Sequence, residues 1–264
     1  MLPPVVSGVR HAARIATPQG PAYALFSGDQ LVLLDAAPWA GGKPIGVQLP
    51  AADATLLAPC TPTKIVCIGV NYADHAKESV SRTTVPDEPV LFLKPPSSVI
   101  GPGVPIALPP GVGRVDHEAE LALVIGRRTF RADRDAARAA IAGVTAVNDV
   151  SARVLQKKDG QFTRAKGFDT FCPLGPWIAL GLDPADLSVR ARVGGELRQD
   201  GRSRDLVCGP VDLVVYISNV MTLEPGDVIS TGTPAGVGPL EPGDEVTIEI
   251  EGVGALVNPV VLRA

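Results

Sequence analysis

The chain has 264 residues, of which 45% are hydrophobic and 20% charged, a composition typical of a folded globular protein rather than a disordered one. Its 24 basic and 28 acidic residues leave a formal net charge of -4 at pH 7, and only 4% of residues are aromatic. These values argue against a nucleic-acid-binding protein, which usually carries a basic stripe or stacking aromatic side chains.

The sequence shows no sign of a membrane or secreted protein. No stretch approaches the ~18 apolar residues of a membrane-spanning helix, and the first residues lack the basic and then apolar start of a secretion signal. Cys60, Cys67, Cys172 and Cys208 form no CxxC pair and no cluster with histidine. We therefore expect a cytoplasmic protein with reduced thiols, no zinc site and no membrane partner.

Residues 1–58 are predicted to form a small N-terminal domain, and residues 59–264 a second, larger one. In the first, the apolar runs 22–26 and 30–34 flank Ser27-Gly28-Asp29, which is typical of a β-hairpin. An Ala-, Pro- and Thr-rich stretch at 50–62 has no clear period and marks the junction.

The second domain is predicted to be β-rich. Its strands are expected at 65–70, 90–93, 118–125, 144–147, 228–231 and 245–250, with a hairpin over 189–199. Helices are expected at 74–82, 133–142 (ended by Gly143), 151–156 and 211–221, and residues 101–113 form a connection without helical period. Because regular βαβ alternation is absent, the pattern favours an α+β fold over a Rossmann or TIM-barrel fold.

Two glutamates begin the apolar strand 118–125. Residues two apart on a strand share a face, so Glu118 and Glu120 are expected to point the same way. Like charges so placed repel unless a proton or a cation neutralises them. On spacing alone, two solvent-facing carboxylates are the more common explanation.

A third carboxylate, Asp149, follows the strand 144–147. Asp149, Arg153 and Gln156 have the i, i+4, i+7 spacing of one helical face, which could place a metal ligand beside an anion-binding group. The alternative is a helix-capping Asp with an intrahelical ion pair. Carboxylates without His or Cys partners suit Mg²⁺ or Mn²⁺ rather than zinc.

Three further segments carry candidate residues. His75 and Glu78, at i and i+3, could form a dyad that activates water, although an exposed ion pair is the commoner outcome. Lys166 lies among small residues and could bind an oxyanion, or be an ordinary surface lysine. Thr233 belongs to a Gly-rich turn that offers N–H and hydroxyl groups to an anion, but it lacks the context of a nucleotide site.

Six segments, taken in order, resemble the fumarylacetoacetate hydrolase superfamily: KIVCIGVNYADHAKE (64–78), PVLFLKPPSSVIGPG (89–103), DHEAELALVIGR (116–127), VNDVSARVLQ (147–156), RAKGFDTFCPLGP (164–176) and STGTPAGVGP (230–239). Residues 1–58 resemble the small N-terminal domain of its 2-hydroxyhepta-2,4-diene-1,7-dioate isomerase branch. In one departure, Val70 occupies a position where the acylpyruvate-hydrolase branch has Arg.

The resemblance implies a mixed β-sandwich roll, a homodimer, and one Mg²⁺ or Mn²⁺. By the same resemblance, the metal ligands are Glu118, Glu120 and Asp149, the substrate contacts are Arg153, Gln156 and Thr233, and the catalytic residues are Lys166, His75 and Glu78. His75 and Glu78 match the pair that activates water in members that cleave a C–C bond.

The expected function is a metal-dependent reaction of enolisable 2-oxo (di)acids through a stabilised enolate. Isomerase or decarboxylase chemistry on 2-hydroxyhepta-2,4-dienedioate is the first choice. Hydrolysis of an acylpyruvate or fumarylpyruvate is the alternative, and a binding protein that retains the fold is the non-enzymatic one. A pyruvate aldolase is disfavoured because (β/α)₈ alternation is missing.

Overall fold

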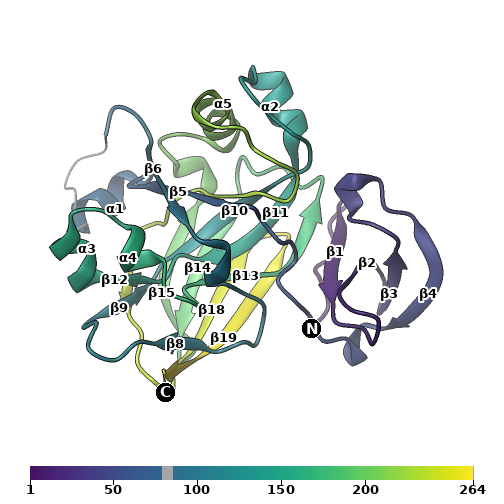
Figure 1. Cartoon of the computed structure of the whole chain (residues 1–264), viewed down its shortest axis with the longest axis horizontal. Helices are drawn as coiled ribbons and strands as arrows, with labels where there is room; N and C mark the ends of the chain where they lie inside the picture. The colour runs from purple at the N-terminus through teal and green to yellow at the C-terminus, as the bar shows by residue number, and fades with distance from the viewer. Residues whose placement is uncertain (79–85, 264) are drawn as a thin grey trace.

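The computed structural model describes residues 1–78 and 86–263, with the side chains of 76–78 outside the description. The described chain is rich in strands (Figure 1). The strands are β1 (Arg10–Ile15), β2 (Ala22–Ser27), β3 (Gln30–Leu34), β4 (Pro44–Pro50), β5 (Ile65–Gly69), β6 (Val90–Lys94), β7 (Val99–Ile100), β8 (Ile106–Leu108), β9 (Val115–His117), β10 (Ala119–Ile125), β11 (Ile141–Asn148), β12 (Ser151–Ala152), β13 (Cys172–Leu180), β14 (Ser188–Val193), β15 (Glu196–Arg202), β16 (Val228–Ser230), β17 (Gly238–Pro239), β18 (Glu245–Ile250) and β19 (Gly254–Leu262). The α-helices are α1 (Ala73–Glu78), α2 (Arg134–Ala140), α3 (Arg153–Asp159), α4 (Thr163–Lys166) and α5 (Pro210–Val220).

One large sheet runs through the whole molecule. Within the described residues it has 11 strands, in the order β4-β3-β2-β1-β13-β11-β10-β16-β5-β6, with β7 paired to β13. The strands β1 to β4 form the small N-terminal domain, at the right of Figure 1. This domain joins the rest through antiparallel pairing of β1 with β13, in which Arg10 faces Leu180 and Ala12 faces Ile178.

The centre of this sheet is buried on both faces. In β10, Leu121 and Leu123 belong to the main hydrophobic core, while Ala122 and Val124 belong to a smaller cluster on the opposite face. This division follows from the alternation of side chains along a strand. A second sheet, of order β15-β14-β18-β19-β8, contributes residues such as Ile248 to the main core. The result is a β-sandwich.

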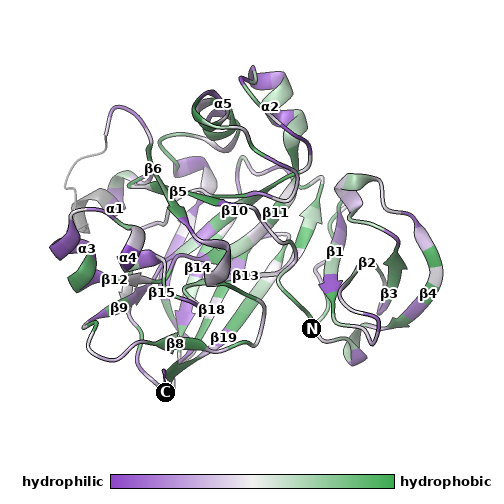
Figure 2. Cartoon of the chain, viewed as in Figure 1, coloured by the Kyte–Doolittle hydropathy of each residue, from purple (hydrophilic) through white to green (hydrophobic). Residues whose placement is uncertain are grey.

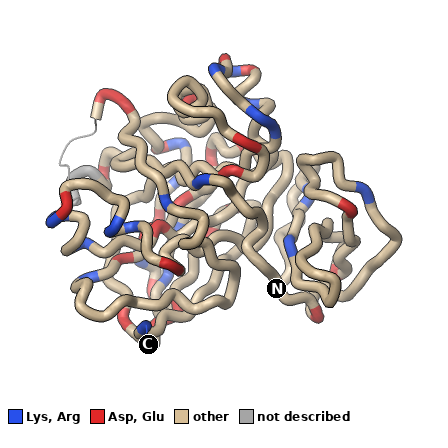
Figure 3. The backbone as a smooth tube through the Cα atoms, in the orientation of Figure 1, with Lys and Arg blue, Asp and Glu red and all other residues tan. Residues whose placement is uncertain are grey.

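The helices cover the margins of the sheets. α2 and α5 pack against each other at the top of Figure 1, while α1, α3 and α4 lie together at its left. Figure 2 shows hydrophobic residues concentrated in the strands and in α5. Acidic and basic residues are interspersed along the chain, as Figure 3 shows. Among residues 1–78 and 86–263, no helix is long and apolar enough to cross a bilayer.

Two local predictions were wrong in detail. α2 ends at Ala140 and β11 begins at once, so Gly143 lies inside a strand, opposite Leu180, rather than at a helix end. The helix expected over 151–156 begins only at Arg153, after the short strand β12. The strand expected over 118–125 is confirmed as β10, which begins one residue later because Glu118 lies between β9 and β10. A short strand, β8, also forms within the connection 101–113.

Candidate functional site

Three carboxylates meet where β10 begins and β11 ends. Ala119 pairs with Asn148 in the β10–β11 ladder, which brings Asp149 beside the start of β10. The backbone N–H of Asp149 donates to the carbonyl of Glu118 at 2.9 Å. Glu118, Glu120 and Asp149 are all buried, and each offers an oxygen within 4.8 Å of those of the other two.

Cations surround two of these carboxylates. The Lys166 ammonium donates to Glu118 Oε2 at 2.8 Å and also to Asp149 Oδ2. Lys94, whose side chain is fully buried on β6, donates to Asp149 Oδ1 at 2.6 Å and to the carbonyl of Val150 at 3.2 Å. Arg153 forms an ion pair with Glu118 Oε1 at 2.7 Å. Burial of these charges is therefore offset by close pairing.

Glu120 is held instead by neutral donors. The hydroxyl of Ser230 and the backbone N–H of Gly232, the latter at 2.8 Å, both donate to Glu120 Oε2. Burial, together with the charges of Asp149 and Glu118, raises the pKa of Glu120 to about 8. The site thus contains one carboxylate whose ionised form needs an added positive charge nearby.

Charged neighbours shift the pKa of Glu118 and the pKa of Lys166 against the effect of burial. Burial alone would raise the pKa of Glu118, but Lys166 and Arg153 outweigh it and hold the pKa well below its usual range. Burial alone would lower the pKa of Lys166, but Asp149 and Glu118 outweigh it and raise the pKa. Lys166 is therefore a cation at neutral pH while it contacts these two carboxylates.

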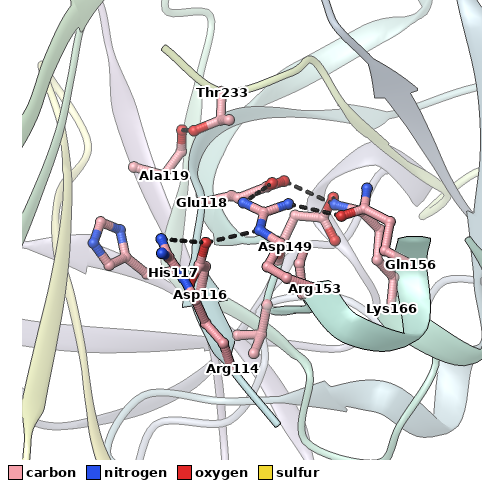
Figure 4. A network of polar contacts seen from close by, with 12 residues as sticks. Arg114, Asp116, His117, Glu118, Ala119, Asp149, Arg153, Gln156, Lys166 and Thr233 are labelled. Atoms are coloured by element: carbon pink, nitrogen blue, oxygen red, sulfur yellow. Dashed lines mark hydrogen bonds and ion pairs between the residues drawn. The ribbon is translucent and has the colours of Figure 1, made fainter. Parts of the chain in front are cut away.

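A second carboxylate orients Arg153. Asp116, which is buried on β9, accepts from Arg153 Nε at 2.8 Å and from Arg114 Nε at 2.6 Å. A further guanidinium nitrogen of Arg153 donates to Gln156 Oε1 at 3.0 Å. Figure 4 shows the guanidinium reaching Asp116, Glu118 and Gln156 at once. Its planar fork is fixed in direction by these contacts.

A small pocket opens on this cluster. Glu118, Glu120, Arg153, Gln156, Lys166 and Thr233 line it. The Phe92 and Phe162 rings, which meet edge to face at 5.2 Å, form an aromatic part of the wall. Val70 also lines the pocket, with a left-handed φ of 57° that is unusual for a β-branched residue. Such strain is a common feature of functional sites.

Thr233 is supported by a glutamine from a distant hairpin. Gln199, buried on β15, donates through Nε2 to Thr233 Oγ1 and to the carbonyl of Pro234, both at 2.7 Å. Its Oε1 accepts from the backbone N–H of Ala119 at 2.9 Å and lies 3.1 Å from His117 Nδ1. The Thr233 hydroxyl itself donates to the carbonyl of Ala119 (Figure 4). The hydroxyl proton of Thr233 is therefore used in a hydrogen bond within the protein.

The structure brings most of the sequence-predicted residues to one place. Asp149 does not share a helical face with Arg153 and Gln156, as the i, i+4, i+7 spacing predicted, because it lies in the turn before β12. The three nevertheless converge on the pocket region from that turn and from α3. His75 is buried on α1 and lines the pocket, whereas the side chain of Glu78 lies outside the described residues.

Sequence reasoning missed Lys94, Asp116, Ser230 and Gln199. Lys94 and Asp116 lie within segments that carried the family resemblance, so a charged residue inside an apolar strand was an available signal. Gln199 has no such signal, since its partners lie 34 to 82 residues away in the chain.

Sequence comparisons agree with this architecture. Residues 64–261 match the family described as fumarylacetoacetate (FAA) hydrolase, C-terminal, and residues 10–59 match one described as Rv2993c-like, N-terminal. Human mitochondrial oxaloacetate tautomerase FAHD2A is 45% identical over 226 residues, which are 81% of this chain and 71% of the human protein.

Two solved structures extend the comparison to the fold. The 2-hydroxyhepta-2,4-diene-1,7-dioate isomerase of Mycobacterium marinum superposes with a TM-score of 0.89 at 45% identity, covering 97% of this chain and 99% of that one. The maleylpyruvate hydrolase of Sphingobium sp. SYK-6, in complex with manganese(II) and pyruvate, gives 0.78 at 31% identity, covering 97% of this chain and 100% of that one. The resemblance and the α+β, β-rich fold with a small N-terminal domain are thereby confirmed, and the chain belongs to the fumarylacetoacetate hydrolase family.

Proposed function

We propose that this protein is a divalent-metal-dependent enzyme that acts on enolisable 2-oxo (di)acids, with isomerase or decarboxylase chemistry of the 2-hydroxyhepta-2,4-dienedioate type. The observation that carries the proposal is the convergence of three buried carboxylates beneath a pocket that is also lined by two basic residues, Lys166 and Arg153. The tautomerase and isomerase relatives support this class of chemistry.

The donor set fits a hard divalent cation. Glu118, Glu120 and Asp149 would hold it, and oxygen-only ligands suit Mg²⁺ or Mn²⁺. The structure itself shows a cation among these oxygens, since the Lys166 ammonium bridges two of the carboxylates. When bound, the metal supplies Lewis-acid polarisation of the substrate's 2-oxo group.

The protein's own residues would bind and orient the substrate. Lys166, which contacts Glu118 and Asp149 at the edge of the pocket, can stabilise negative charge on a substrate oxygen. Arg153, fixed by Asp116, can hold a substrate carboxylate through its remaining N–H groups. His75 lines the same pocket, and its role is what separates the two candidate reactions below.

Hydrolysis of an acylpyruvate or fumarylpyruvate is the second candidate. It is favoured by the position of His75 on the pocket wall and by the structural likeness to a maleylpyruvate hydrolase. In that reaction His75, with Glu78, would activate the attacking water. The two candidates differ in their need for this histidine.

A substrate panel tests the proposal. Oxaloacetate, an acylpyruvate, fumarylpyruvate and a 2-hydroxydienedioate are each followed by absorbance and product mass, with Mg²⁺, with Mn²⁺ and with EDTA. We expect metal-dependent turnover that Glu120→Gln abolishes, while Glu196→Gln, at an exposed hairpin position, serves as the matched control.

The outcomes separate the candidates. Isomerisation or decarboxylation that survives His75→Ala supports the first candidate, whereas C–C cleavage lost in His75→Ala supports the hydrolase. Turnover that persists in EDTA and in Glu120→Gln would contradict the metal-dependent mechanism. A lack of both turnover and metal binding by the parent protein would favour a binding protein that retains the fold.

A further inference from the structure

The two lysines at the site contact Asp149 on different sides. Lys94 holds Oδ1 and is also tied to the carbonyl of Val150, so its ammonium is anchored to the backbone. Lys166 holds Oδ2 and, at 2.8 Å, Glu118 Oε2. The same division applies to Glu118, whose Oε1 pairs with Arg153.

Each of these two carboxylates therefore has an outer and an inner oxygen. The outer oxygens, Glu118 Oε1 and Asp149 Oδ1, are held by Arg153 and Lys94. The inner oxygens, Glu118 Oε2 and Asp149 Oδ2, both accept from the Lys166 ammonium. A divalent cation that binds both carboxylates would compete for these inner oxygens, since Arg153 and Lys94 on the outer ones are themselves anchored by Asp116 and by the carbonyl of Val150.

We propose that Lys166 is an internal competitor for the metal: its ammonium occupies the cation position between Glu118 and Asp149 and must be displaced from their inner oxygens when a divalent ion binds. This inference rests on the proposed metal-dependent function. Two positive charges cannot share one site at low cost, because like charges in contact repel strongly in a partly buried environment. The net affinity for the ion therefore includes the cost of moving Lys166.

An aromatic ring lies close enough to Lys166 to contact its ammonium after displacement. Lys166 Nζ already lies 5.0 Å from the centre of the Phe92 ring, within the range of a cation–π contact. Phe92 lines the pocket, so a shift toward its face keeps the charge beside the substrate. Lys166 ends α4 and has a flexible four-carbon side chain, which allows such a shift without moving the backbone.

The test compares two variants that each remove one positive charge from Asp149. Mn²⁺ binding is measured by isothermal titration calorimetry in the parent protein, in Lys166→Met and in Lys94→Met. We expect Lys166→Met to bind Mn²⁺ about tenfold or more tightly than the parent, and clearly more tightly than Lys94→Met, because only Lys166 competes for the inner oxygens.

A thermal-shift measurement provides a second readout. Without added metal, Lys166→Met should melt below the parent, because Glu118 and Asp149 lose a shared cation. Saturating Mn²⁺ should then raise its melting temperature more than that of the parent, as tighter binding to the folded state requires. If Lys166→Met does not fold, Lys166→Gln, which keeps a hydrogen-bond donor without the charge, takes its place in both measurements.

The results distinguish this inference from the function on which it rests. Metal-dependent turnover by the parent, with Mn²⁺ affinity in Lys166→Met no higher than in Lys94→Met, would overturn the competition and leave the proposed function intact. A parent protein that neither binds Mn²⁺ nor needs it for turnover would overturn both.

Discussion

Replacing Gln199 by leucine tests how much its buried hydrogen bonds around Thr233 stabilise the protein. The amide has one possible orientation, because the carbonyl of Pro234 can only accept and the N–H of Ala119 can only donate. His117 Nδ1 must therefore carry the proton that faces Gln199 Oε1. Leucine would leave three buried groups without these partners: the N–H of Ala119, the Nδ1–H of His117 and the carbonyl of Pro234.

The size of the effect follows from this count. An unsatisfied buried polar group costs about 1–3 kcal/mol, so Gln199→Leu should lower the free energy of unfolding by roughly 3 kcal/mol or more. That is a large fraction of the about 5–15 kcal/mol that stabilises a typical domain, but it leaves the protein folded. Because Thr233 lines the pocket, KM for the best substrate of the panel should also rise.

Urea denaturation of the parent and Gln199→Leu measures the first effect. Gln48→Leu, at an exposed position of β4, is the control and should change stability by less than about 0.5 kcal/mol. The double variant Gln199→Leu/Thr233→Val should lose less than the sum of the single losses, since the two side chains share one hydrogen bond. A loss for Gln199→Leu within about 1 kcal/mol of the control would refute the reasoning.

Three further outcomes are expected. Burial lowers the pKa of His11 and His117 below the ordinary 6.5, so both are neutral in the fold and take up protons on unfolding. The stability that they contribute is complete above about pH 6.5 and is lost as the pH falls below it. The urea midpoint of the parent should therefore drop between pH 7.5 and 5, and that of His11→Gln should drop less. Equal drops in the two proteins would contradict this. Val70→Asn should raise the free energy of unfolding by about 1 kcal/mol, because Asn tolerates the left-handed φ of 57° better than Val; a lower urea midpoint would show that Val70 packing outweighs its strain. Gly143→Ala should cost about 1–3 kcal/mol, since an added Cβ would lie 2.5 Å from the carbonyl oxygen of Ala179; an unchanged thermal midpoint would argue against that tight strand contact.

Local sequence signals predicted much of the fold. The hairpin of β2 and β3 and the helix α5 fall within a residue or two of the expected positions, because turn residues and continuous apolar runs define them locally. The Pro-Gly pairs at 225–226 and 242–243 are typical of type II turns, and Gly226 and Gly243 have the positive φ that such turns need, 89° and 99°. The wrong details, such as Gly143, arise where strand pairing overrides the usual end of a helix.

The site was predictable only in part. Spacing placed Glu118 and Glu120 together, but a turn rather than a helix positions Asp149. The cations could not be assigned from spacing, because Lys94 and Lys166 lie 55 and 17 residues from Asp149 in the chain. Such contacts depend on how the sheets pack, and no local pattern encodes them.

Because the large sheet continues into the small N-terminal domain, that domain covers the edge of β13. β1 pairs with β13, so Ile178 and Ala179, both fully buried, belong to an interior strand only while residues 10–12 lie beside them. Removal of that domain would expose the apolar end of β13, residues 178–180, as an edge with unpaired N–H and carbonyl groups. Such edges recruit strands from other molecules. By covering this edge, the N-terminal domain disfavours self-association of the rest of the chain.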